Sequence, residues 1–375
     1  MVARPRAQRA SRHARSAPHR RLVVEPMITP RSSPPDANTL ADVAAALRVV
    51  AGRTAVEGPW SSGAMHALAQ SGVLAAFVPA DVGGSAAGEW PLLELLTIVA
   101  EECLTTALVM SQWAAAVRII ATAAADVRRR YLPPLARGES FTTVGVSQIT
   151  TSRQHVGKPV LAATRDGDAW RLDGLCPWVT GADEADTIVT GAATAAGERL
   201  FFVVPVPAAG LSIEPPMQML ALSASRTSAV RLESVRPAAV IVAATDAPRS
   251  GGLATTALAL GATRAAVRLI AAEGDTRPHL RAIAESLAAE AAALTGRLRE
   301  AAVNGIEIAA RDRLRGDANG LVTRSAQAAL TAAKGAGFVR GHPAERLARE
   351  SLFFLVWSCP PAVATSLLCE LAHID

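Results

Sequence analysis

The chain has 375 residues, of which half are apolar and 19% are charged. This length and apolar content allow a large buried core in two or three domains, and they exclude a disordered protein. The formal net charge is +5, but residues 1–22 contain many arginines and no acidic residue. The rest of the chain is close to neutral, so the charge does not indicate a nucleic-acid-binding protein.

Residues 1–38 are interpreted as a disordered basic tail followed by a Pro/Ser-rich linker. A start that is rich in Arg, Ser and Ala and free of acidic residues is typical of an organelle transit peptide. A start codon assigned too early, with Met27 as the first residue, is the favoured alternative. Lys158 and Lys334 are the only lysines among 38 basic residues, as expected of a GC-rich bacterial genome.

The four cysteines, Cys103, Cys176, Cys359 and Cys369, are far apart and form no CxxC or Cys/His cluster. This spacing predicts reduced thiols and no metal site. No charge-free apolar run reaches the roughly 18 residues that a membrane-spanning helix needs. We therefore expect a soluble, cytoplasmic protein that binds neither metal nor membrane.

The hydrophobic pattern predicts an N-terminal helical domain at residues 39–139. Apolar residues recur at three- and four-residue spacing from Leu40, and this helix should end at Gly52. A second helix should stop near Gly72, before a short extended piece and a turn at Gly83. Two further helices are expected at residues 90–124 and 126–138.

Gly, Pro and β-branched residues are denser at residues 140–246, where short runs predict a central β domain of barrel or sandwich type. Asp166, Gly167 and Asp168 stand between two alternating runs and predict a hairpin. Residues 247–375 return to a helical pattern, with antiparallel helices expected at 253–274, 277–316 and 318–338. The predicted fold class is α+β and mainly α.

Four short motifs occur along the chain, at residues 77–84 (FVPADVGG), 131–139 (YLPPLARGE), 173–186 and 335–350. Their order, and the order of the domains, resemble the acyl-CoA dehydrogenase superfamily, which also contains flavin monooxygenases and nitroalkane oxidases. The resemblance extends from about residue 60 to the C-terminus. It implies an FAD-dependent oxidoreductase acting on a small molecule such as an acyl-CoA, and a homodimer or homotetramer.

The strongest local match contains Trp178 and Thr180. It resembles the family strand in which a Trp and a Thr, two residues apart, face the isoalloxazine ring. Alternate strand residues share a face, Trp can pack against a flat ring, and a Thr hydroxyl can hydrogen-bond its edge. Ser147 stands where the family holds the pyrimidine edge with a Thr. The alternative for Trp178 is a core aromatic residue and that for Thr180 an ordinary strand residue. The alternative for Ser147 is a position in a polar surface loop.

Downstream of Ser147, the sequence departs from the family. Thr150, Thr151, Ser152 and Arg153 replace the Gly-Ser-Asp portion that binds the flavin pyrophosphate. Hydroxyls and an arginine can still bind phosphate.

Residues 335–350 resemble the family's Gly-rich turn and its Pro-x-Glu-Arg-x-x-Arg-Asp helix. Glu345, Arg346, Arg349 and Glu350 of this helix are predicted to form ion pairs that position helices.

The family's catalytic base is missing. Ser358 occupies the position of the usual Glu, and residues 251–257, where a minority of the family carries its Glu, contain no carboxylate. A serine hydroxyl is not an equivalent base without an activating partner. No catalytic residue is therefore assigned. The alternatives to an acyl-CoA dehydrogenase are a flavin monooxygenase or oxidase and a non-catalytic partner subunit of a heteromeric dehydrogenase.

Overall fold

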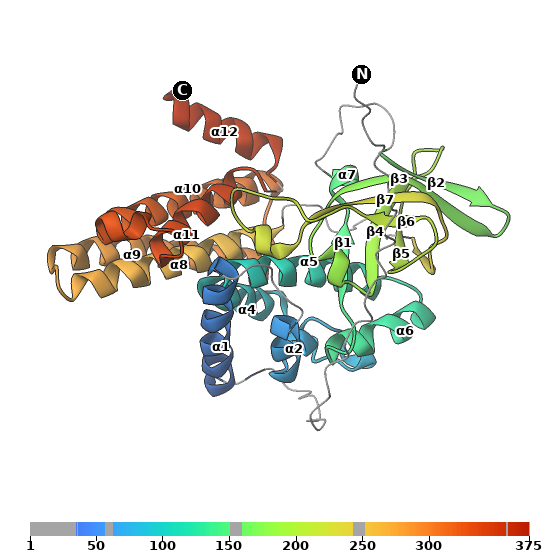
Figure 1. Ribbon diagram of the computed structural model, residues 1–375, viewed down its shortest axis with the longest axis horizontal. Coiled ribbons are helices and arrows are strands. Elements are labelled where there is room, and N and C mark those ends of the chain that lie inside the picture. Colours follow the sequence, from blue (N-terminus) through green and yellow to red (C-terminus); the bar gives the residue numbers. More distant parts are fainter. Residues whose placement is uncertain are drawn as a thin grey trace, which may run out of the picture.

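The computed structural model describes residues 35, 37–56, 63–150, 160–242, 252–357 and 359–374. N-terminal helices, a central sheet and a C-terminal helical bundle follow one another along the chain (Figure 1). The predicted fold class is therefore confirmed. The N-terminal tail, Met27 and the pyrophosphate candidates Thr151, Ser152 and Arg153 lie outside the described residues.

The N-terminal part is helical up to Ala136. Its elements are α1 (Ala37–Val56), α2 (Gly63–Gln70), α3 (Val73–Ala76), η1 (Ala80–Val82), α4 (Glu89–Glu102), α5 (Leu104–Ala121) and α6 (Ala125–Ala136).

Three predictions for these helices were wrong. Helix α1 does not end at Gly52 but continues to Val56. The segment after Gly72 is not extended, because a turn of helix and a 3-10 turn form there. The single helix expected at residues 90–124 is broken at Cys103, whose φ of −151° and ψ of 98° belong to extended backbone. The break separates α4 from α5, and both helices contribute to the same buried core.

The central part is one mixed sheet of eight strands, where the sequence left a barrel and a sandwich open. Its elements are β1 (Thr142–Gly145), α7 (Ser147–Thr150), β2 (Leu161–Asp166), β3 (Ala169–Val179), η3 (Ala182–Glu184), β4 (Thr187–Ala193), β5 (Arg199–Pro205), β6 (Leu211–Ile213), η4 (Ser223–Ser225), β7 (Ser228–Val235) and β8 (Ala239–Ile241). The strand order is β6-β7-β3-β2-β4-β5-β8, with β1 parallel to β4. The predicted hairpin is confirmed, since Asp166 pairs with Ala169 across a turn at Gly167.

The C-terminal bundle consists of α8 (Leu253–Gly274), α9 (His279–Asn304), α10 (Ile308–Ala333), η5 (Lys334–Phe338), α11 (Pro343–Ser351), η6 (Leu352–Leu355) and α12 (Pro361–Ala372). The helix expected to reach Gly316 ends at Asn304 instead. Gly305 has a φ of 78°, a value that glycine adopts without strain. Gly316 lies inside α10, where its added Cβ would meet nothing within 4 Å.

Helix α5 lies between the sheet and the C-terminal bundle (Figure 1). Both α5 and α8 are long and apolar enough to cross a membrane by composition. However, 78% and 61% of the apolar windows of these two helices are buried inside the fold. The core of the molecule therefore accounts for both helices.

An ion-pair network joins the first and last parts of the chain. Arg268 on α8 donates to Glu101 at 2.6 Å and to both carboxylate oxygens of Glu102, at 2.9 and 3.0 Å. Glu102 is buried and also lies 3.4 Å from Arg48 on α1. A buried charge needs such partners, so the network fixes the bundle on α1 and α4.

Candidate functional site

The indole of Trp178 is unusually exposed for a residue at the end of a central strand. Cys176 and Val179 are fully buried, whereas Trp178 is 49% exposed. The pairing of β3 with β7 shifts register between Cys176 and Val179. Such a bulge re-aims side chains, and it presents a large flat apolar surface on the β domain.

Thr180 lies in a different environment from Trp178. It is only 7% exposed, and its Oγ1 lies 3.1 Å from Thr227 Oγ1, which in turn lies 2.9 Å from Ser225 Oγ. Its carbonyl oxygen accepts a 2.7 Å hydrogen bond from the Thr143 hydroxyl. Alternation along a strand would have placed Trp178 and Thr180 on one face, but β3 ends between them at Val179. The hydroxyl chain instead fixes the turn after β3.

Ser147 begins the short helix α7, directly after β1. The neighbouring Gln148 is buried, and its amide nitrogen lies within hydrogen-bond distance of Gly145 O (2.8 Å), Gly191 O (2.9 Å) and Thr190 Oγ1 (3.1 Å). Gln148 Nε2 is also 3.5 Å from the sulfur of Cys176. These contacts fix α7, which Ser147 begins, against β3 at Cys176 and against β4. Gln148 was not identified as a site residue from the sequence, where it reads as one polar residue in a loop.

Cys176 is not a nucleophile in this arrangement. Burial raises the pKa of its thiol to about 12. A thiol is inert when it stays protonated, so Cys176 contributes packing.

The helix α11 connects the bundle to the β domain. Arg349 donates to the carbonyl oxygen of Leu220 at 3.1 Å, and it forms a two-pronged ion pair with Glu345. Arg346 lies 3.9 Å from Glu350. The predicted ion-pair role of this motif is therefore confirmed.

Glu350 is a buried carboxyl on the same helix. Desolvation raises its pKa to about 7, against the lowering effects of Arg346 and Arg349. Glu350 interacts electrostatically with Cys103, at the break between α4 and α5. Its contacts therefore place it at a junction of helices.

The segment that aligns with the family's catalytic base is held in place by side chains of α10. Arg315 donates to the carbonyl oxygen of Trp357 at 2.6 Å, and Asn319 donates to that of Phe354 at 3.0 Å. Arg315 is fully buried, and burial lowers the pKa of its guanidinium to about 10. Ser358 itself lies outside the described residues. The first turn of α8, the family's other base position, contains no acidic residue.

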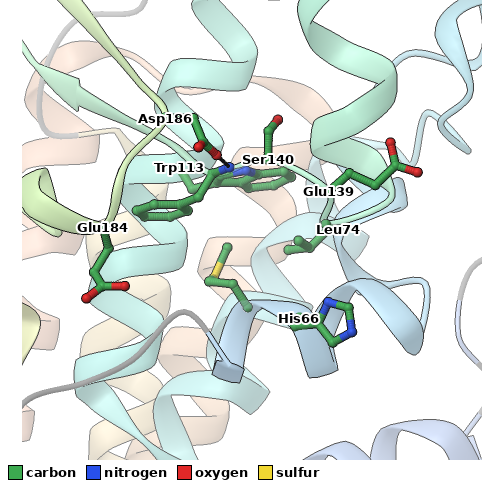
Figure 2. A pocket seen from close by; sticks show the side chains of 10 residues that line it. His66, Leu74, Trp113, Glu139, Ser140, Glu184 and Asp186 are labelled. Atoms are coloured by element: carbon green, nitrogen blue, oxygen red, sulfur yellow. Dashed lines mark hydrogen bonds between the residues drawn. The ribbon is translucent and has the colours of Figure 1, made fainter. Parts of the chain in front are cut away.

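A cavity of about 240 Å³ lies between the N-terminal helices and the β domain, on α2, α3, α5 and the connections around β1 and η3. Its floor is apolar, with Met65, Leu74 and Trp113, all of which are buried. Figure 2 shows Trp113 with Glu184 and Glu139 to either side and His66 on the opposite wall. No sequence pattern indicated that these residues would line one cavity.

Part of the sequence is similar to known acyl-CoA dehydrogenases. Residues 38–139 match the family model described as the acyl-CoA dehydrogenase N-terminal domain. Acyl-CoA dehydrogenase FadE12 of Mycobacterium tuberculosis is 31% identical over 184 residues, which cover 47% of each chain. The short-chain specific acyl-CoA dehydrogenase of Mus musculus is 24% identical over 45% of this chain and 42% of its own length. The match thus spans less than half the length of these relatives.

The fold likeness extends over nearly the whole chain. The butyryl-CoA dehydrogenase of Megasphaera elsdenii superposes with a TM-score of 0.76 and covers 90% of this chain and 97% of its own. The two sequences are 15% identical, so this likeness establishes the fold alone.

Proposed function

We propose that this chain, which belongs to the acyl-CoA dehydrogenase superfamily, is an FAD-dependent oxidoreductase that acts on a small acyl thioester or a related substrate. The observation that carries the proposal is the half-exposed indole of Trp178 on an otherwise buried strand end. A half-exposed indole can stack on the flat ring of a ligand. A cytoplasmic location remains part of the same proposal.

The residues of the β domain fit the ring portion of FAD. Trp178 offers a flat face for stacking, and Gln148 ties the Ser147 helix to β3 at Cys176 and to β4 at Gly191. Ser147 would lie at the pyrimidine side of the ring. Thr180 has its hydroxyl engaged by Thr227, so its contribution would be to hold the turn and to offer its remaining lone pair. Bound FAD would supply the hydride acceptor.

A second candidate function is a non-catalytic partner subunit of a heteromeric dehydrogenase. It is favoured by the described first turn of α8, which lacks a carboxylate, and by the Ser at position 358. Removal of a general base costs about 10²–10⁴-fold in rate. A monooxygenase or oxidase, in which reduced flavin reacts with oxygen, does not need this base, and it is the form of the first proposal most compatible with the sequence.

The test is FAD binding by the purified full-length chain and by Trp178→Ala. We expect visible flavin absorption in the wild type and an FAD affinity weakened by roughly two orders of magnitude in Trp178→Ala, because a buried aromatic contact contributes a few kcal/mol. Trp90→Ala on α4 is the matched control and should bind FAD like the wild type.

Equal FAD affinity in Trp178→Ala would contradict the proposed ring site. A wild-type chain that stays colourless after FAD is added would favour the partner-subunit function.

A further inference from the structure

The cavity beneath α5 is enclosed by parts that the fold holds rigidly. Gly138 has a φ of 68°, and a Cβ there would lie 2.4 Å from Ala69 Cβ, so the connection before β1 runs directly against α2. The opposite wall is fixed by Asp186, whose carboxylate accepts a 2.8 Å hydrogen bond from the Phe141 amide. The Asp186 amide in turn donates to Phe141 O at 2.8 Å. Ligand sites are usually preformed in this way.

The charge around the cavity is negative. The described lining contains the carboxylates of Glu139, Glu184 and Asp186 and no lysine or arginine. Glu139 is neutralised by Arg137 at 2.7 Å. Glu184 lies 3.7 Å from Arg226, whose guanidinium is bound to Asp183.

Asp186 forms no ion pair within the part of the chain that the structure describes. Within that part of the chain, its carboxylate accepts a hydrogen bond from the Phe141 amide. No cationic side chain of the described residues therefore lies against Asp186, and Glu184 is only loosely paired with Arg226.

A second and independent feature is the indole of Trp113. Its side chain is 0% exposed and forms part of the cavity floor, yet its N–H finds no acceptor among the described residues. A buried polar group without a partner is costly, and it is a common mark of a site that is completed by a ligand. An aromatic face beside carboxylates is also the usual receptor for an ammonium group.

We propose that this cavity binds a small amine or quaternary ammonium compound that carries a hydroxyl or carbonyl oxygen. The ammonium would lie near Asp186 and Glu184, and the oxygen would accept the hydrogen bond of Trp113. A volume of about 240 Å³ equals about eight waters at ~30 Å³ each, so a ligand of choline size fits. The site is separate from the Trp178 surface, and its ligand need not be the substrate of the oxidoreductase.

The test uses two probes of the same shape. Choline has both the ammonium and the hydroxyl, whereas 3,3-dimethylbutan-1-ol has a neutral carbon in place of the nitrogen. Titration calorimetry on the full-length protein should detect choline, with the neutral probe at least about tenfold weaker, since a cation over an aromatic face adds up to about 2 kcal/mol.

Three variants locate the binding. Asp186→Asn keeps an acceptor for the Phe141 amide and removes the charge, so choline binding should weaken at least about fivefold. Trp113→Phe keeps a ring and removes the N–H, and it should weaken binding by about three- to tenfold. Glu198→Gln, an exposed charge change at the turn between β4 and β5, should leave binding unchanged.

Three results would overturn the proposal. The first is the absence of choline binding at millimolar concentration, and the second is equal binding of the two probes. A loss of binding in Glu198→Gln similar to that in Asp186→Asn would show general charge attraction, which also overturns it. FAD binding is a separate readout, so failure here leaves the flavin proposal standing.

Discussion

Glu350 shows how burial alone can make a side chain pH-sensitive. Its pKa is about 7 in the fold, against 4.5 for an ordinary glutamate, with desolvation as the largest cause. The folded state therefore favours the neutral carboxyl. The stability that the neutral form provides is complete below pH 4.5 and is lost as the pH rises through about 7.

The corresponding prediction concerns Glu350→Gln, which cannot ionise. We expect this variant to match the wild type at pH 4.5 and to exceed its free energy of unfolding at pH 8 by about 3 kcal/mol, the value of the pKa difference. Urea unfolding at both pH values measures it.

Glu345→Gln on the same helix is the control, with the opposite sign. The ion pair with Arg349 lowers the pKa of Glu345, so this substitution should destabilise the protein at neutral pH. A wild type whose stability relative to Glu350→Gln does not change between pH 4.5 and 8 would contradict the prediction.

At the scale of single residues, the sequence indicated ion pairs but not the surroundings of the candidate site residues. The ion pairs of α11 follow from i, i+4 spacing, and they could be predicted. The exposure of Trp178 and the burial of Thr180 depend on a register shift between β3 and β7, and neither strand encodes that shift alone. The triple contact of Gln148 depends on Gly145, Thr190 and Gly191 from two other strands, so no local pattern could have indicated it.

Helix boundaries were predicted well where a local sequence signal marks them. The helix expected at residues 253–274 is observed at Leu253–Gly274, after a pair of glycines. The boundary between α9 and α10 was misplaced because Gly305 and Gly316 look alike in the sequence. Only the first is a helix end, with a positive φ. Space around the second lets it remain helical.

The crossing of α4 and α8 depends on one glycine. A Cβ on Gly261 would lie 2.3 Å from Thr97 O and 2.6 Å from Ala100 Cβ. Because the nearest atom is backbone, the helices must separate, which typically costs about 1–3 kcal/mol or more. Gly261→Ala should therefore lower the free energy of unfolding despite the better helix propensity of alanine.

Gly316→Ala is the matched control for this prediction, since both glycines lie inside long helices. The added Cβ at position 316 meets nothing within 4 Å, so alanine should stabilise the protein by about 0.5–1 kcal/mol. Denaturant unfolding of both variants should give changes of opposite sign. A stabilised Gly261→Ala would show that α4 and α8 can separate at little cost.

At the scale of the whole molecule, the C-terminal end leaves many apolar side chains uncovered. Helix α12 contacts the bundle through α10 and lies at its edge (Figure 1). Leu368 and Leu371 on this helix are exposed, as is Ile374 just after it. Phe338 and Val356 are also exposed, at 79% and 74%. Apolar surface of this kind is usually covered by a partner, and a second copy of the same chain is the commonest one.

We therefore predict that the protein is at least a homodimer through its C-terminal bundle. Light scattering after size exclusion should give at least twice the chain mass at micromolar concentration. Phe338→Asp combined with Val356→Asp should shift the mass to that of the monomer, because each carboxylate would have to be buried without a partner. Val49→Asp, at an apolar position on α1 that is also exposed (56%), should leave the dimer intact. A wild-type monomer at this concentration would contradict self-association, and the exposed end would then be the natural docking surface for a competent dehydrogenase chain in the partner-subunit function.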